Sequence, residues 1–299
     1  MNISILINIV YILAAIAFIL GFKLMSSPES ARKGNLISGI GMLSAIIVTL
    51  MDAQVQRYDF ILIGLLAGSV VGLILAYRTP MTGMPQMVGL LNGFGGLASF
   101  LVAWAEFHAH KHHLTAGSAA IIWVAAIIGA VTFTGSVIAW AKLEEKFISG
   151  KPITYKGQQI VTTIVVLGML VSGALFAMQV QSENGYLYFA AFTFFSMVLG
   201  VLLTIPIGGA DMPVVICLLN SYSGMAACAS GFIIQNNLLI VAGALVGASG
   251  IILTLIMCKA MNRSIANVFL GGFGTPPSGS SAEVVGELKE VKADDAYLM

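Results

Sequence analysis

Apolar residues along this chain form long continuous runs and do not alternate with polar ones. A helix needs about 20 mostly apolar residues to cross the hydrocarbon core of a bilayer. Nine stretches meet this requirement, at approximately residues 3–24, 34–51, 60–77, 84–106, 117–141, 159–180, 186–205, 213–234 and 238–258. They lack the two-residue alternation of a membrane β-barrel. The pattern predicts an all-α polytopic membrane protein, with a bundle of about nine transmembrane helices within residues 1–263.

Composition supports this class of protein. Apolar residues make up 58% of the 299 positions and charged residues 9%, with a mean hydropathy of +0.96, whereas a soluble domain carries roughly 25% charged residues. The net charge of +1 gives no indication of nucleic-acid binding. Cys217, Cys228 and Cys258 lie inside predicted spans, at spacings that match neither a disulfide framework nor a metal site. We therefore interpret the cysteines as packing residues.

Basic residues are distributed unevenly between the predicted loops. If the C-terminus is cytoplasmic, only Arg57 and Lys111 lie outside. The other twelve lie on the cytoplasmic side: Lys23, Arg32, Lys33, Arg78, Lys142, Lys146, Lys151, Lys156, Lys259, Arg263, Lys289 and Lys292. Because cytoplasmic loops carry the excess of Lys and Arg, the N-terminus is predicted to be outside and the C-terminus cytoplasmic.

The character of the chain changes after Arg263. Residues 264–282, which include "GGFGTPPSGSSA" at 271–282, are predicted to form a Gly/Pro/Ser linker. Residues 283–299 are charged and too few to form a domain. We interpret them as the start of a truncated or separately encoded domain, or as a tether to a partner.

Two polar residues interrupt the apolar run in "GGADMPVVICLLNSYSG" at 208–224. Asp211 stands before Met212 and Pro213, the arrangement of a helix N-cap followed by proline in the first turn. A capping role and a functional role both remain open for Asp211. Asn220 lies nine residues further on, about 13.5 Å along a helix and close to the middle of the membrane core. An amide at that depth requires a hydrogen-bond partner.

An internal repeat offers such a partner. Residues 84–98, "MPQMVGLLNGFGGLA", and residues 212–226, "MPVVICLLNSYSGMA", share Met-Pro, Leu-Leu-Asn, an aromatic residue, Gly and Ala at the same spacings. The following helices are more loosely similar, with "IIGAV" leading to Lys142 and "LVGAS" leading to Lys259. We infer two related helical hairpins that bring Asn92 and Asn220 near the centre of the bundle.

Small and hydroxyl residues accompany the two amides. Gly243 and Gly247 form a GxxxG pattern that is followed by Ser249 and Gly250. Hydroxyl groups also lie on the span at 117–141, namely those of Thr132, Thr134 and Ser136. Such residues either pack helices closely together or line a hydrated proton or ion route, and both interpretations stay open. Bonding of the hydroxyls to their own helix is the structural alternative.

Four motifs, "GGADMPVV…LNSYSG", "GALVGASG", "IMCKAMNRS" and "GAVTFTGSV", resemble the membrane part of the beta subunit of proton-translocating nicotinamide nucleotide transhydrogenase. The resemblance covers nearly all of residues 1–290. It implies a multi-pass protein of the bacterial cytoplasmic (inner) membrane, in which inward proton flow drives hydride transfer from NADH to NADP+. It also implies that NAD(H) and NADP(H) bind to partner soluble domains and not to this chain.

The resemblance also assigns roles to individual residues. It implies that Asn220, Ser249 and Gly250 belong to the proton pathway, to which we add Asn92, Thr134 and Ser136. It places Asp211 at the membrane surface beneath the NADP(H) domain and Arg263 at the junction to the linker. With Lys259, these two residues form the expected coupling group at the cytoplasmic face.

The chain departs from the family at Asn92, where many members have a histidine. Asparagine cannot titrate, whereas the unperturbed pKa of histidine, about 6.5, suits proton transfer. Our hypothesis is that a histidine on a membrane helix of a separate alpha subunit faces Asn92, and that Asn92 and Asn220 order water around it.

A second departure concerns the end of the chain. The sequence reaches Met299 without the Gly-rich phosphate turn of a dinucleotide-binding fold. We therefore expect that this chain alone does not transfer hydride. The expected partners are one or more alpha subunits that carry the NAD-binding domain and membrane helices, an NADP(H)-binding domain after the linker, a second protomer and the lipid bilayer. The alternatives are an independent secondary transporter or ion channel with a midplane polar site, and a structural scaffold.

Two features of the predicted outer side have a structural explanation as well as a functional one. The sequence "HAHKHH", with His108, His110, His112 and His113, has irregular spacing and favours a solvated loop over a metal site. Glu106 lies at the outer end of the Asn92 span, and is interpreted either as an outer exit group for the proton or as a carboxylate at the membrane boundary.

Overall fold

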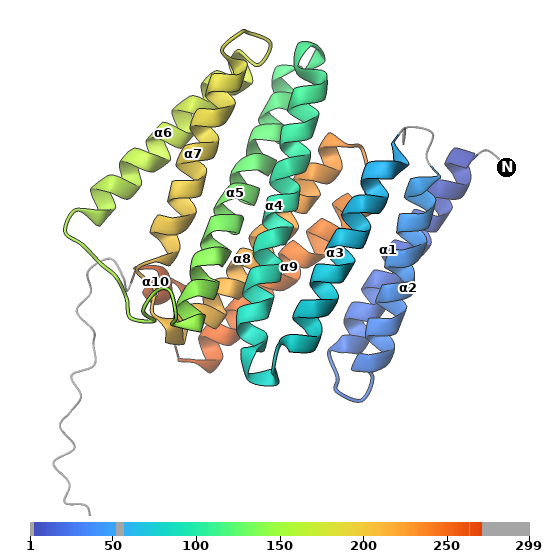
Figure 1. Cartoon of the computed structure of the whole chain (residues 1–299), viewed down its shortest axis with the longest axis horizontal. Coiled ribbons are helices and arrows are strands. Elements are labelled where there is room, and N and C mark those ends of the chain that lie inside the picture. The colour runs from blue at the N-terminus through green and yellow to red at the C-terminus, as the bar shows by residue number, and fades with distance from the viewer. Residues whose placement is uncertain (1–2, 52–56, 263, 271–299) are drawn as a thin grey trace, which may run out of the picture.

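A computed structural model describes residues 3–51, 57–262 and 264–270 of the chain (Figure 1). The described residues form helices joined by turns, and contain no strand. The helices are α1 (Ile3–Met25), α2 (Ala31–Leu50), α3 (Tyr58–Arg78), α4 (Met84–His110), α5 (Ala116–Glu144), α6 (Gln158–Met178), α7 (Gly185–Thr204), α8 (Met212–Ile233), α9 (Asn237–Ala260) and α10 (Ile265–Leu270). Within the described ranges, α1 to α9 are each long and apolar enough to cross a membrane. The predicted all-α membrane fold is confirmed.

Both copies of the internal repeat begin with the same local structure. A 3₁₀ turn, Met81–Gly83 or Gly209–Asp211, leads directly into α4 or α8, and proline is the second residue of each helix. Proline suits this position because the first N–H groups of a helix have no partner within it. Both helices start at what we call the lower end of the bundle, drawn at the bottom of Figure 1.

Equivalent glycines in the two hairpins allow the paired helices to approach each other closely. In the first, a Cβ atom added at Gly96 of α4 would lie 2.9 Å from the carbonyl oxygen of Gly129 on α5. In the second, a Cβ atom on Gly224 of α8 would collide with the backbone of α9 at Gly243 and Gly247. Backbones approach this closely only where side chains are absent. The GxxxG pattern of α9 therefore packs α9 against α8.

Helix α5 occupies the centre of the bundle and contacts α4, α6, α7 and α8. In the most apolar part of α5, half of the residues are buried inside the chain, a larger share than in any other of the nine membrane-length helices described. Close packing continues on the α7 side, where a Cβ atom on Gly200 would lie 3.0 Å from the backbone nitrogen of Gly135. Movements of α5 are thus constrained by four neighbours.

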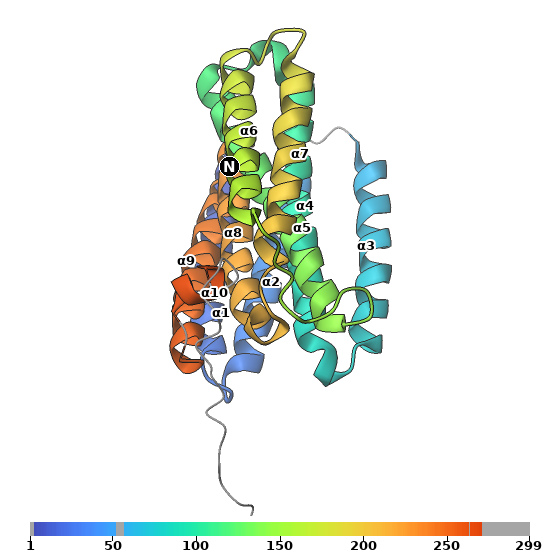
Figure 2. The same cartoon turned by 90° about the vertical axis from the view of Figure 1, so that its left-hand side faces the viewer.

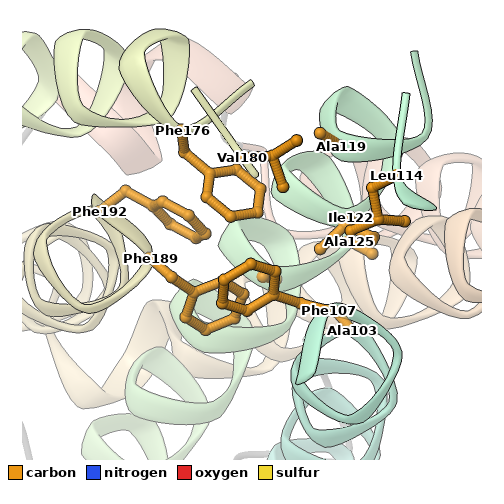
Figure 3. Close-up of a cluster of buried hydrophobic side chains, with 11 residues drawn as sticks. Ala103, Phe107, Leu114, Ala119, Ile122, Ala125, Phe176, Val180, Phe189 and Phe192 are labelled. Atoms are coloured by element: carbon orange, nitrogen blue, oxygen red, sulfur yellow. The ribbon is translucent and has the colours of Figure 1, made fainter. Parts of the chain in front are cut away.

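An aromatic core joins the α4–α5 hairpin to α6 and α7 at the upper end (Figure 3). The rings of Phe107 and Phe189 stack with their centroids 5.1 Å apart, and Phe176 meets Phe107 edge-on at 5.0 Å. Phe192 lies 4.8 Å from Phe189. Aromatic pairs at these separations attract each other beyond their burial of area. This aromatic core therefore holds α4, α5, α6 and α7 together at the upper end.

Helix α3 stands apart from the other helices (Figure 2). None of its residues is buried. Added Cβ atoms on Gly64, Gly68 and Gly72 would meet no atom within 4 Å. Among the described residues, α3 is thus an apolar helix whose surface the chain itself leaves uncovered.

The short helix α10 lies within residues 264–282, the predicted linker. Its Val268 is buried and packs in a cluster that includes Met212, Ile216 and Cys258. The first residues after α9 therefore fold back onto the start of α8.

Two adjacent glycines of α4 test the packing at the hairpin crossing. We expect Gly96→Ala to reduce the free energy of unfolding by about 1–3 kcal/mol, because its methyl group would overpack the backbone of α5. Thermal unfolding of the purified protein in detergent measures the effect. Gly95→Ala is the control, since a Cβ atom there meets nothing within 4 Å. Equal unfolding midpoints for the two variants would contradict the crossing.

Candidate functional site

Asn92 forms a buried polar junction where α4, α5 and α8 meet. Its side chain is 8% exposed. The amide nitrogen donates a hydrogen bond to Ser136 Oγ of α5 at 2.9 Å, and the amide oxygen accepts one from Ser223 Oγ of α8 at 2.7 Å. A primary amide has two N–H donors and two acceptor lone pairs. Asn92 therefore retains one donor and one acceptor beyond these bonds.

Asn220, the equivalent amide of the second hairpin, has a different environment. It is half-buried, and its side chain has no hydrogen-bond partner among the described residues. In the repeat frame, Thr254 of α9 corresponds to Ser136, but Thr254 donates to the carbonyl of Gly250 on its own helix at 2.7 Å. Among the described residues, the two amides therefore do not bond to each other. Asn92 bonds instead to Ser223, which lies three residues after Asn220 on α8.

The other hydroxyl groups predicted for the pathway differ in their bonding. Thr134 donates to its own helix, to the carbonyl of Ala130 at 3.1 Å, as the structural alternative expects. Thr132 is fully buried, and its hydroxyl has no hydrogen-bond partner within the described part of the chain. Because Thr132 lies four residues from Ser136, it extends the polar face of α5 by one turn.

Gly250 lies on the contact between α8 and α9, and Ser249 precedes it on α9. Ser249 donates back to the carbonyl of Val246 at 2.9 Å. A Cβ atom on Gly250 would lie 2.8 Å from the backbone nitrogen of Ser221. The hydroxyl of Ser221 in turn donates to the carbonyl of Gly247 at 2.6 Å. The Ser249 bond thus lies within α9, the Ser221 bond joins α8 to α9, and neither bond extends to Asn92.

Asp211 lies at the lower end, in the N-cap position of α8. Its side chain makes no capping hydrogen bond, although its location is that predicted for a cap. It borders a depression of about 640 Å³ whose lining includes Lys142, Glu145 and Lys151. Lys259 is exposed in the last turn of α9. Arg263 lies outside the described residues.

At the upper end, the histidine-rich segment is largely helical and not an open loop. His108 and His110 belong to α4, while His112 and His113 lie in a 3₁₀ turn. Glu106 Oε1 is 2.9 Å from His110 Nδ1, and His108 Nδ1 is 3.1 Å from the hydroxyl of Tyr186. Among the described residues, no group of three or more His, Cys, Asp or Glu is arranged to hold a metal ion.

Two residues of the candidate site, Ser223 and Lys142, were not predicted from the sequence. Ser223 is one of the positions at which the two copies differ, because the first copy has Gly95 there. That difference was the available signal for the hydroxyl group that bonds to Asn92. From the sequence, Lys142 was interpreted only as one of the basic residues on the cytoplasmic side, but its side chain is fully buried in the structure. No local pattern distinguishes it from the exposed lysines nearby.

Comparisons with known proteins agree with one another. A family model described as NAD(P) transhydrogenase beta subunit matches residues 7–299. The NAD(P) transhydrogenase subunit beta of Rhodospirillum rubrum is 43% identical over 300 residues, which cover 97% of this chain and 64% of that protein. The protein of the same name from a designated strain of that species gives the same values. The chain thus spans 64% of the length of these relatives.

The junction makes a prediction about stability. We expect Ser223→Ala to reduce the free energy of unfolding by about 1 kcal/mol, because the buried oxygen of Asn92 loses its hydrogen-bond donor. Unfolding in mixed detergent micelles measures this loss. Ser249→Ala should be close to neutral, since the hydroxyl of Ser249 bonds only to its own helix in the structure. A larger loss for Ser249→Ala than for Ser223→Ala would refute the assignment.

Proposed function

Because the chain belongs to the NAD(P) transhydrogenase beta subunit family, we propose that it is the proton-translocating membrane component of such an enzyme, coupling inward proton flow to hydride transfer from NADH to NADP+. The observation that carries the proposal is the buried junction of Asn92, Ser136 and Ser223. Buried polar groups inside a membrane bundle are costly, and usually mark a pathway for ions or protons.

The proposed pathway follows polar positions on three helices. On α4, Asn92, Ser99 and Glu106 are spaced seven residues apart, so they share one face. Asn92 and Ser99 are buried, and the side chain of Glu106 is 25% exposed. Fourteen residues separate Asn92 from Glu106, or about 21 Å along the helix. Glu106 is then the outer exit group, meaning the end of the route at the outer surface.

From the junction, the proposed route continues toward the cytoplasm along α8, where Asn220 lies between the junction and Asp211. On α5, which runs from the upper to the lower end, Ser136 belongs to the junction and Thr134 lies on its outer side. We assign water to the unpaired polar groups of Thr132 and Asn220, because buried polar groups without a partner are rare in proteins. Gly250 contributes by setting the separation of α8 and α9, and Ser249 lies beside it on α9.

The titrating group is proposed to come from another chain. Asn92 cannot titrate, but its remaining donor and acceptor suit a histidine on a membrane helix of an alpha subunit. Leu91 and Phe94, on either side of Asn92 along α4, are 50% and 51% exposed. Together with the uncovered α3, they leave room for helices that the chain does not supply. We place the alpha-subunit helix against this face of α4.

The lower end is proposed to be the cytoplasmic face, where coupling takes place. Asp211 and Arg263 have opposite charges, and protonation of Asp211 would weaken their attraction, a local change that a neighbouring domain can sense. Lys259 adds to the same cluster. An NADP(H)-binding domain is proposed to follow residues 264–282, and NAD(H) is proposed to bind on the alpha subunit. On this proposal, the chain alone transfers no hydride.

The complete enzyme is proposed to reside in a bacterial inner membrane as a dimer of protomers. Its central test is proton-driven NADPH formation in proteoliposomes that contain the chain, the alpha subunit and the NADP(H)-binding domain. A proton gradient should accelerate NADPH formation in the complete complex and not when the chain is omitted. Solute uptake by the chain without nucleotide would instead favour an independent transporter.

Ser136→Ala tests the junction in the same proteoliposomes. We expect proton-driven NADPH formation to fall roughly tenfold, the scale of one lost hydrogen bond that holds a functional group in place. Hydride exchange that does not require proton flow should be unchanged. Ser44→Ala is the matched control, because Ser44 is a hydroxyl on α2 that bonds only to its own helix in the structure. Equal coupling in the Ser136→Ala variant and the unsubstituted complex would sink the proposed role.

Photo-crosslinking tests the position of the alpha subunit. A benzophenone amino acid at Leu91 should crosslink to an alpha-subunit membrane helix in the assembled complex, as read by mass spectrometry of the product. The same amino acid at Ile164, which is 61% exposed on α6, should react with lipid or detergent. The placement fails if Leu91 gives lipid adducts and Ile164 gives the subunit crosslink.

A further inference from the structure

Lys142 is a fully buried cation in the last turn of α5. Its ammonium group donates hydrogen bonds to three main-chain carbonyl oxygens, at 2.5 Å to Ile205, 2.7 Å to Ile207 and 3.1 Å to Lys151. An ammonium group has three N–H donors, so these three bonds satisfy it completely. Removing such a charge from water is unfavourable unless it is fully hydrogen-bonded.

The three acceptors belong to two separate segments of the lower end. Lys151 lies in the connection between α5 and α6, while Ile205 and Ile207 follow the end of α7. The carbonyl groups at a helix C-terminus carry partial negative charge, which attracts a cation. Ile205 is the C-cap residue of α7, directly after its last residue, Thr204. Lys142 therefore joins the ends of α5 and α7 through one side chain.

Backbone hydrogen bonds connect the same two segments. The amide of Gly209 donates to the carbonyl of Gly150 at 2.7 Å, and the amide of Ile153 donates to that of Ile205 at 3.3 Å. Gly209 begins the 3₁₀ turn that ends at Asp211. The location of Asp211 at the start of α8 thus depends on an arrangement centred on Lys142.

Helix α5 links this arrangement to the polar junction. Ser136, which bonds to Asn92, lies six residues before Lys142, or about 9 Å along the same helix. A shift of α5 therefore changes the contacts of Ser136 and those of Lys142 together. One rigid element spans the distance between the buried amide and the loop that carries Asp211.

We propose that Lys142 is a positioning residue for proton coupling, which acts by holding the Asp211 loop in register with α5. This inference rests on the function proposed above for the chain. Lys142 does not carry the proton in this scheme. It keeps Asp211 at the location where a change at the junction reaches the adjoining soluble domain.

The test compares variants of the complete complex in proteoliposomes. Lys142→Met retains the length of the side chain and removes its charge and donors. We expect it to lower proton-driven NADPH formation at least tenfold, with hydride exchange that needs no proton flow unchanged. Lys142→Arg, which can still donate to several carbonyls, should restore at least a third of the rate. Lys146→Met controls for loss of a nearby charge, because Lys146 is 76% exposed.

A double substitution separates positioning from general damage. If Lys142 acts through Asp211, Lys142→Met should change the rate less than twofold in a complex that already carries Asp211→Asn, because effects on one shared element are not additive. Independent, multiplicative losses would overturn the proposal. Activity within twofold of the unsubstituted complex for Lys142→Met alone would also overturn it. An unsubstituted complex without proton-driven activity would instead refute the proposed function.

A second pair of variants leaves Lys142 in place, in case Lys142→Met does not fold. Gly209→Pro removes the N–H that bonds to Gly150, at the first position of a helical turn where proline fits. Gly209→Ala retains that N–H, and its Cβ atom would lie no closer than 3.5 Å to Gly150. We expect at least a threefold loss of proton-driven activity for Gly209→Pro and less than a twofold loss for Gly209→Ala. Equal activities would overturn the proposal.

Discussion

The hydrogen bonds of Asn92 determine how closely three helices must approach one another. An amide in a membrane bundle has little water to bond with, so its partners have to come from neighbouring helices. Ser136 and Ser223 reach Asn92 only because α4 approaches α5 and α8 closely. Gly93 allows this approach, since a Cβ atom there would lie 3.2 Å from that of Ser136. The hydrogen bonds of Asn92 therefore depend on the glycines, which allow the helices to come close enough for these bonds to form.

The two hairpins have the same glycine-mediated helix crossing, but the hydrogen bonding of their amides differs. Gly96 meets Gly129 in the first, and Gly224 meets Gly247 in the second, so the helix crossings are equivalent. The amides are not equivalent, because Ser136 bonds across to α4 whereas Thr254 bonds back to α9. One amide is therefore held and the other is left unpaired by the chain. A repeat that builds two similar crossings supplies two different polar environments.

Much of the fold was accessible from sequence, because membrane spans are long and locally encoded. Runs of apolar residues and the Met-Pro starts of α4 and α8 gave the helices to within a few residues. The hydrogen-bond partners were less accessible, since they depend on how helices rotate against each other. Thr134 and Ser136 lie two residues apart on α5, yet only Ser136 bonds to Asn92. The burial of Lys142 likewise depends on carbonyls more than sixty residues away along the chain, at Ile205 and Ile207.

The exposed surface of α3 bears on how such a protein is made. A helix of this length and apolarity is stable in a bilayer by itself, so insertion does not require it to pack. Insertion and assembly then become separate events for α3, with lipid as its first neighbour.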